Sequence, residues 1–387
     1  AMESEGMDRR TLSMPKNHEA LVKAVSEVQK NTVVVVMCGG CITMPWIDDV
    51  RGVLYAYLGG EAVGTATLDL LFGDVNPSGK LAETFPRRLK DNPSYLYFLG
   101  DEQNKTEYRE GVFVGYRYYD KKNMDVLFPF GYGLSYTTFT QKMSDITSDG
   151  SSLKFSVTVT NTGSAAGKDV VEIYNDPPYT NGGIEKASAN LLDFAKTGEL
   201  APGESETIDF TIPVEDLASY DYQNNGCYVL EAGDYVISTN ADSHTALDSK
   251  TYTVASDIVY NESNKRESDE VVATNQFDFA EGEITYLSRA DGFANYDEAT
   301  AAPATYEMSD EVKAGFENCF TYTESGYEKD EDPNAEDITT GAKNGLKLAD
   351  LRGVDYNDAK WDALLDQMSI DDLQQLSLIH ISEPTRL

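Results

Sequence analysis

The pair Cys38 and Cys41 is the first feature of the sequence whose spacing could do chemistry. Cys-x-x-Cys is the spacing of redox pairs and of half a zinc site. No second such pair accompanies it, and the three histidines are far apart in the sequence, at His18, His244 and His380. Because two thiolates supply only half of a tetrahedral zinc site, we interpret the motif as two small residues that flank a glycine turn. No metal is expected.

The composition narrows the range of partners. The chain has 387 residues, and 31 Lys and Arg against 66 Asp and Glu give it a formal net charge of −35. Such a surface repels phosphate backbones and anionic headgroups, so we expect neither nucleic acid nor a membrane as partner. The 24 Tyr and 15 Phe suit neutral ligands such as sugars, whose C–H faces stack on rings. There is no P-loop, dinucleotide fingerprint or GxSxG elbow, and no cofactor is expected.

Residues 17–37 begin with a helical period and continue as a strand. Asn17 is expected to cap the helix, and apolar side chains then recur on one helical face, at Leu21, Val25 and Val28. A continuous β-branched run follows at 32–37. Such a run is too apolar for a strand with one solvated face, so we predict a parallel strand that is covered on both sides.

A second strand and helix complete the first domain's pattern. Residues 53–58 are strand-like, and a helix is predicted from about Ala62 to Phe72, closed by Gly73. Helices that alternate with strands at this spacing indicate an α/β layer with right-handed crossovers. We assign the α/β domain to residues 1–145, of which the stretch after Asn76 is irregular and rich in Tyr, Gly and Pro.

The period changes to strict alternation of apolar and polar residues near Leu153. Turn signals separate the alternating segments, which lie at 153–159, 171–173, 208–212 and 235–237. Several strands separated by turns predict an antiparallel β-sandwich over 146–257. The tyrosine cluster at 116–119 also alternates like a strand, and we interpret it as packing between the two domains.

The last third of the sequence has weaker patterns. Residues 258–349 are acidic with few apolar periods, so we expect a linker there. A helical period returns in residues 350–379, where apolar side chains share one face. They are Trp361, Leu364, Leu365 and Met368. Residues 380–387 continue no pattern and are interpreted as a foreign or truncated end.

Several motifs in the first 139 residues resemble the α/β-sandwich domain of family 3 glycoside hydrolases, the β-glucosidase and β-xylosidase family. They are NTVVV (31–35), MPW (44–46), LGGE (58–61), LFGDVNPSGKLAETFP (71–86), GYRYYD (115–120) and FPFGYGLSYTTF (128–139). The following sandwich is similar to the fibronectin type III-like module of the same family. Its motifs are NTG (161–163), LAPGES (200–205) and DLASY (216–220). The match covers roughly 250 residues in order.

The order of the domains departs from the usual one of this family. In most members a (β/α)8 barrel precedes the two domains, whereas here residues 351–378, with WDALLDQM (361–368), resemble the entry of that barrel. The resemblance therefore implies a multi-domain α/β plus all-β protein in a permuted order. The α/β sandwich is followed by the fibronectin-like module, a linker and the first helices of a barrel that is truncated at its start.

The resemblance also implies the residue that transfers protons. Retaining hydrolysis needs two carboxyls about 5–5.5 Å apart, a nucleophile and an acid/base. In this family the acid/base is commonly a Glu in a Glu-Gly-x-Asp-Arg-like loop, which here reads SEGMDR (4–9). The role falls on Glu5, with Glu3 as its rival, and Gly6 would let the loop approach a sugar. Asp8 and Arg9 are interpreted as partners that fix the loop, and Arg9 also as a substrate-binding residue.

The implied function is that of a fragment of a retaining, exo-acting β-glucosidase with a β-glucoside or oligosaccharide as substrate. A β-xylosidase is the alternative within the family. The family's nucleophile is a barrel Asp, and no Asp of this chain matches it, so we expect the chain alone to be inactive. A non-catalytic carbohydrate-binding or adhesion protein is the alternative from another class, and it would not need Glu5.

Two properties are left open by the sequence. The first residues match no signal peptide and resemble a cut inside a larger protein, and no run of about 18 apolar residues occurs. The compartment, cytoplasmic or secreted, and the oligomeric state therefore stay undecided.

Overall fold

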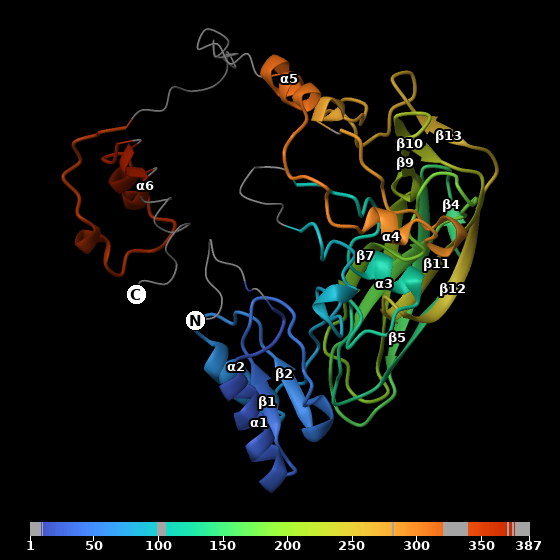
Figure 1. Cartoon of the computed structure of the whole chain (residues 1–387). Coiled ribbons are helices and arrows are strands. Elements are labelled where there is room, and N and C mark those ends of the chain that lie inside the picture. The colour runs from blue at the N-terminus through green and yellow to red at the C-terminus, as the bar shows by residue number, and fades with distance from the viewer. Residues whose placement is uncertain are drawn as a thin grey trace. The chain divides into compact units, whose positions relative to one another are not determined.

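The computed structural model describes residues 9, 11–98, 106–280, 282–319, 340–369, 371–373 and 375. The chain divides into two compact units, Ala1–Asn318 and Cys319–Leu387, which are treated separately below (Figure 1). No helix in these described ranges is long and apolar enough to cross a membrane.

The first unit begins with the predicted α/β layer. It consists of α1 (Lys16–Val28), β1 (Val33–Val36), β2 (Gly52–Tyr55) and α2 (Val63–Phe72). The two strands are adjacent and parallel, as predicted, with Val33 opposite Gly52. Gly73 ends α2 with a φ of 82°, which also confirms the prediction. Helix α1 begins at Lys16 rather than after Asn17, because Pro15, with a φ of −53°, precedes it and sets the entry.

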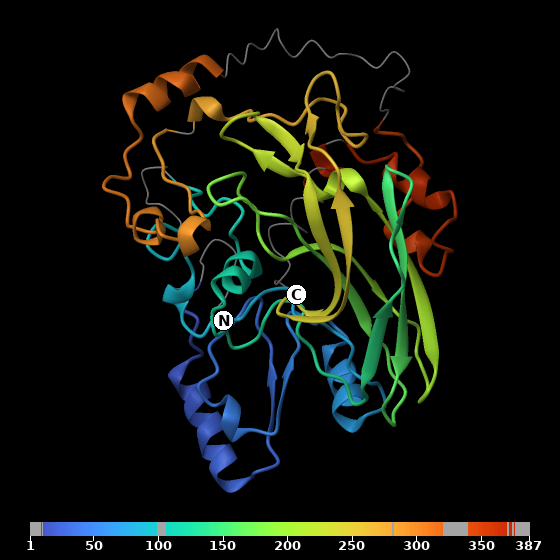
Figure 2. The same ribbon diagram turned by 90° about the vertical axis from the view of Figure 1, so that its right-hand side faces the viewer.

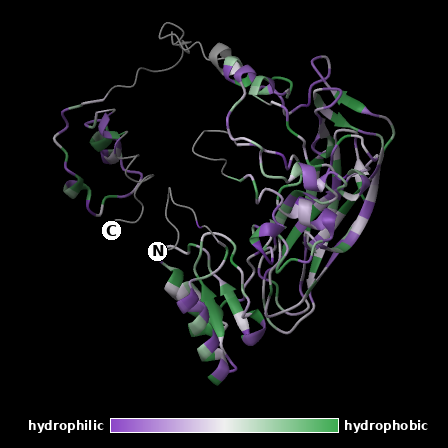
Figure 3. Cartoon of the chain, viewed as in Figure 1, coloured by the Kyte–Doolittle hydropathy of each residue, from purple (hydrophilic) through white to green (hydrophobic). Residues whose placement is uncertain are grey.

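The covering of this layer differs from the prediction. Along β1 only Val36 is buried, and Val33 is 47% exposed. The helical face with Leu21, Val25 and Val28 is also exposed, whereas Val22 packs on the core of the layer. The strands appear as apolar arrows in Figure 3. Within the described residues β1 pairs only with β2, so each of the two strands has one edge without a strand partner there.

The tyrosine cluster forms helix α3 (Tyr116–Lys122), not a strand. The prediction that it packs between the two domains holds for Tyr116, whereas Tyr118 and Tyr119 pack against residues 287–299. Tyr118 and Tyr119 are buried in a second apolar cluster, and the hydroxyl of Tyr116 accepts a hydrogen bond from the backbone N–H of Leu191 in the sandwich (3.0 Å). Alternation over four residues is compatible with either period, and Gly115, with a φ of 59°, starts the helix.

The predicted antiparallel sandwich follows. One sheet has the order β12-β11-β6-β7, and in the other β5 pairs with β3, β4 and β8. Figure 2 shows β11 and β12 as long yellow strands beside each other. The strands of the two sheets are β3 (Phe139–Met143), β4 (Thr147–Ser148), β5 (Ser152–Asn161), β6 (Val170–Asp176), β7 (Asn190–Lys196), β8 (Ser205–Pro213), β11 (Gly233–Asp242) and β12 (Thr245–Val254).

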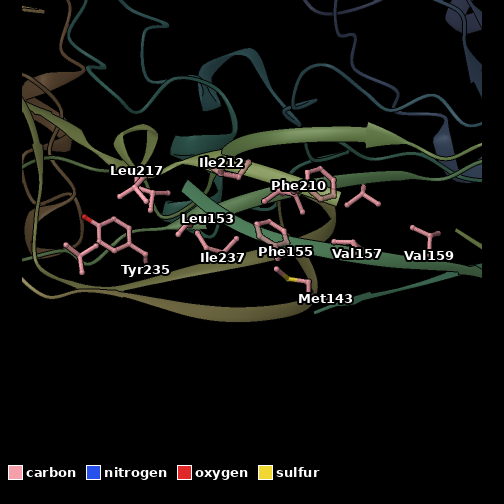
Figure 4. Close-up of a cluster of buried hydrophobic side chains, with 14 of the residues drawn as sticks. Met143, Leu153, Phe155, Val157, Val159, Phe210, Ile212, Leu217, Tyr235 and Ile237 are labelled. Carbon is pink, nitrogen blue, oxygen red and sulfur yellow. The ribbon is translucent and has the colours of Figure 1, made fainter. Parts of the chain in front are cut away.

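A closed apolar core lies between these sheets. Figure 4 shows Phe155 and Val157 of β5, Phe210 of β8 and Ile237 of β11 in one cluster. Strict alternation on β5 places every second side chain in this core, so that Leu153, Val157 and Val159 have no exposed surface. A small third sheet of β9 (Ser219–Asp221), β10 (Cys227–Leu230) and β13 (Ile258–Tyr260) completes the module.

The structure corrects the expected boundaries of the sandwich and the linker. Strand β3 pairs with β5, so the sandwich begins before residue 146, and β13 extends it beyond 257. The stretch 258–319 is not a plain linker. It contains α4 (Tyr296–Ala299) and α5 (Asp310–Cys319), and Leu287, Phe293 and Ala299 are buried against α3. These apolar residues are few and lack a period, which is why composition missed them.

Short helices account for the remaining elements. In the first unit the 3-10 helices are Ile47–Asp49, Leu89–Asp91, Val214–Leu217, Asp278–Ala280 and Ala290–Gly292. In the second unit the predicted helical period forms α6 (Lys360–Leu365), preceded by a 3-10 turn at Leu348–Leu351, and residues 371–373 and 375 are also helical. The indole N–H of Trp361 donates to the backbone oxygen of Asp355 (2.9 Å). Residues 380–387 lie outside the described part.

Candidate functional site

Of the predicted site residues, Arg9 is described, whereas Glu5, Glu3, Gly6 and Asp8 lie outside the described residues. The Arg9 guanidinium Nη2 donates a hydrogen bond to the backbone oxygen of Cys41 (2.9 Å). The same nitrogen would lie 3.1 Å from a Cβ placed on Gly40. Arg9 is therefore held by the turn that follows β1, at the carboxyl end of the parallel strands. Ligands of open α/β sheets bind at this edge.

The Cys38–Cys41 motif forms the turn that receives Arg9. Cys38 and Cys41 are thiols that form no disulfide and are half-buried, and no group of metal-binding side chains is found among the described residues. Burial raises the pKa of the Cys41 thiol to about 12, and the Glu83 carboxylate beside it adds to this effect. The motif thus acts as a glycine turn between small residues, and the thiol of Cys41 stays protonated and poorly nucleophilic.

Two tyrosines at the end of β2 complete this edge. The hydroxyl of Tyr55 donates to the backbone oxygen of Gly40 in the turn. Tyr57 has a φ of 47°, which is rare for a residue with a side chain. Burial, followed by the nearby Glu83 carboxylate, raises the pKa of Tyr57. Strained backbone of this kind gathers at functional sites.

A pocket of about 350 Å³ opens beside the Cys41 turn. Its walls come from five parts of the α/β domain and are mainly apolar and aromatic. They include Leu12, Cys41, Glu83, Asn92, Tyr116, Tyr119 and Phe130. Tyr116 and Phe130 stack with ring centroids 4.7 Å apart. An aromatic wall with one carboxylate can hold a small neutral ligand by stacking and by hydrogen bonds to hydroxyl groups.

The sequence pointed to Arg9 but not to Glu83 or Tyr57. Glu83 stands within the motif string at 71–86 as one acid among many, and only the fold brings it to Cys41. No pattern in the sequence marks the left-handed conformation of Tyr57, which is set by the exit from β2. The strand end itself, predicted at 53–58, was the one available signal.

Comparison with known proteins identifies the two domains that carry this geometry. Residues 1–136 match the glycosyl hydrolase family 3 C-terminal domain, and residues 169–243 match the fibronectin type III-like domain. Both matches lie in the first unit, one on the α/β layer and the other on the β-sandwich. The first two domains of this chain belong to glycosyl hydrolase family 3.

Several β-glucosidases of this family are similar to the chain. The thermostable β-glucosidase B of Acetivibrio thermocellus is 49% identical over 241 residues, which are 61% of this chain and 31% of that protein. The β-glucosidase of Kluyveromyces marxianus is 38% identical and covers 67% of the chain and 30% of its own length. The chain thus spans less than a third of the length of these curated relatives.

A solved structure of the family shares the fold. β-Glucosidase 3B from Thermotoga neapolitana in complex with α-D-glucose has a TM-score of 0.62 and 37% identity, and covers 66% of this chain and 37% of that chain. The family 3 α/β layer followed by a fibronectin-like sandwich is therefore the arrangement of residues 1–260 here. The motif strings of 31–86 and 115–120 lie within the first matched segment, and those of 200–205 and 216–220 lie within the second. The string 128–139 runs past residue 136, and 161–163 lies between the two segments.

Proposed function

We propose that this chain is the acid/base-bearing part of a retaining, exo-acting β-glucosidase. Its family 3 domains, its β-glucosidase relatives and the glucose complex of a structural neighbour support this proposal. Glu5 would protonate the departing glycosidic oxygen and then deprotonate the attacking water. The nucleophile carboxylate would come from a (β/α)8 barrel, whose entry residues 351–378 resemble. The domain order would then be the permuted one, in which the barrel follows the two domains instead of preceding them.

The observation that carries the proposal is the anchoring of Arg9 at the carboxyl edge of β1. Glu5 precedes Arg9 by four residues, and four residues span at most about 14 Å. Because Arg9 is held at the Cys41 turn, this reach would allow the carboxylate of Glu5 to act near this edge, beside the 350 Å³ pocket. In this role Arg9 fixes the acid/base loop, and a direct contact with substrate is a further part of the proposal.

The test is the kinetics of Glu5→Gln in the parent enzyme that contains this segment. Cleavage of alkyl or disaccharide β-glucosides should slow by about 10²–10⁴-fold, the usual share of general acid catalysis. An activated aryl β-glucoside needs little protonation of its leaving group, so its glycosylation step should slow much less. Azide should restore turnover of the aryl substrate, because it attacks the intermediate without a general base.

Glu3→Gln is the matched control, since it removes the same charge from the same loop. It should leave both substrates unaffected. If Glu3→Gln shows the leaving-group dependence and Glu5→Gln does not, the role belongs to Glu3. If Glu5→Gln slows both substrates equally and azide does not rescue it, the acid/base residue lies outside this loop. Running the panel with β-xylosides beside β-glucosides decides between the two sugar specificities.

A further inference from the structure

The α/β domain and the sandwich meet at a joint built from polar groups. We define the joint as the contact of residues 76–84 and 116–133 with β6, β7 and the β11–β12 hairpin. Several hydrogen bonds cross it, among them one from Lys196 Nζ of β7 to Ser78 Oγ (3.0 Å). The N–H of Ser243 donates to the oxygen of Phe130 (2.9 Å), Lys80 Nζ donates to the oxygen of Ala241 (2.8 Å), and the N–H of Leu191 donates to the hydroxyl of Tyr116 (3.0 Å).

A carboxyl group is buried in the middle of this joint. Glu172 of β6 is only 4% exposed, and its Oε2 accepts a hydrogen bond from the hydroxyl of Tyr174 (2.8 Å). Its two oxygens face the backbone of Gly131 so closely that a Cβ there would overlap them. Gly131 has a φ of 80°. The turn of the α/β domain therefore closes directly over the carboxyl group of the sandwich.

A second protonatable contact lies at the same joint. Nδ1 of His244, in the β11–β12 hairpin, contacts Oδ1 of Asp120 on α3. The Asp120 side chain is 9% exposed. The contact is an ion pair only while the imidazole is protonated. The contact thus adds a polar link between α3 and the β11–β12 hairpin beside Glu172.

The surrounding charges act in opposite directions on Glu172. Lys80, from the α/β domain, favours its charged form, and so does the hydrogen bond from Tyr174. Asp242 of β11 and Asp169 before β6 disfavour it. Burial outweighs all of them and raises the pKa of Glu172 to about 7. Burial likewise raises the pKa of Asp120, against the lowering effect of His244.

We propose that the joint is a proton-operated latch, in which protonation of Glu172 holds the α/β domain closed on the sandwich and deprotonation loosens it. The direction of this pH effect follows from Glu172, whose pKa in the folded state lies above the ordinary value of 4.5. Its stabilising contribution is fully present below about 4.5 and is lost as the pH rises through about 7. The latch regulates domain docking and is independent of the proposed hydrolysis.

The experiment is hydrogen exchange of the whole chain at pH 5.5 and pH 8, with protection factors corrected for the intrinsic exchange rates. The amides of Ser243 and Leu191 report the joint because their hydrogen bonds cross it. We expect their protection to fall at least about 10-fold between the two pH values. Core amides of β5 and β8, which do not reach the joint, should keep theirs.

Glu172→Gln tests whether this carboxyl group is responsible. The amide keeps an acceptor for Tyr174 and cannot lose a proton, so the joint amides should stay protected at pH 8. The matched control is Glu262→Gln, which changes an exposed glutamate and should behave as the wild type. Joint amides with equal protection at both pH values in the wild type overturn the latch. A Glu172→Gln chain that loses joint protection as the wild type does also overturns it.

A wild-type measurement covers the case in which Glu172→Gln fails to fold. The side-chain carboxyl carbon of Glu172, followed by nuclear magnetic resonance, should titrate near neutral pH. The amide shifts of Ser243 and Leu191 should move with the same midpoint. A midpoint below pH 5 for the carboxyl group, or joint amides that do not follow it, contradicts the proposal.

Discussion

The sandwich and the α/β layer bury their apolar side chains in different ways. In the sandwich both sheets contribute to one core, whose strands β5 and β11 place alternate side chains inside it. In the α/β layer one face of β1 packs on a core with Trp46 and Phe85, whereas Val33 and the Leu21 face of α1 are exposed. Antiparallel strands can face water on one side, but parallel strands need cover on both.

This difference shows which region is stabilised by contacts among its own elements. Two facing sheets close a core within the sandwich itself, so its stability comes from contacts among its own strands. The α/β layer has a single closed side in the described residues. Its order depends more on contacts with other segments, such as the joint to the sandwich, and substitutions should affect the two regions unequally.

The largest expected effect is in the closed core. Val157→Asp places a charge where the side chain has no exposed surface, and we expect a loss of roughly 4 kcal/mol or more, or no folded sandwich. Val35→Asp, on the half-buried strand β1, should cost about 1–2 kcal/mol, because water reaches the new carboxylate. Thermal unfolding followed by circular dichroism measures both. Equal losses would contradict the comparison.

An intermediate effect is expected at the joint between the two regions. Gly131→Ala adds a methyl group onto the Glu172 carboxyl and forces a φ of 80° on alanine, so we expect a loss of about 3 kcal/mol. Gly150→Ala is the matched control, since Gly150 has a φ of 93° and open space around its Cβ position. It should cost about 1 kcal/mol. The difference, measured by urea unfolding, isolates the contact with Glu172.

The sequence predicted the elements better than their surroundings. Alternation on 153–159 leaves a single interpretation, because only a strand puts every second residue on one face. A helical period at Leu21, Val25 and Val28 shows that α1 is a helix with an apolar face, but not whether another segment covers that face. The buried residues of 258–319 escaped prediction for a related reason. Leu287 and Phe293 pack against α3 as isolated apolar residues, and their spacing in the sequence follows neither a helical nor a strand period.

Of the candidate site, too, only a part could be predicted from the sequence. Arg9 followed from its place in a motif string, and the structure holds it at a strand end. Glu83 could not be predicted, because its role depends on the meeting of two segments about 40 residues apart in the sequence. The joint was missed for the same reason. Glu172 reads as one polar residue in an alternating strand, and only the turn at Gly131 makes it a buried carboxyl group.

The smallest expected effect tests the two faces of a single strand. Val36→Ala removes two methyl groups that lie against the core of the α/β layer, and Val36 is 6% exposed. We expect a loss of about 2 kcal/mol. Val33→Ala makes the same change on the same strand at a side chain that is 47% exposed, so its cost should stay below about 0.5 kcal/mol. The loss of β propensity is common to both variants and cancels in the difference.

Trp46 makes this comparison measurable, because it lies in the same core and is 4% exposed. The chain has two tryptophans, and Trp361→Phe leaves Trp46 as the reporter of the α/β layer in urea unfolding. If Val33→Ala costs as much as Val36→Ala, the outer face of β1 is covered in solution. The layer would then be as closed as the sandwich, and the contrast between the two regions would not hold.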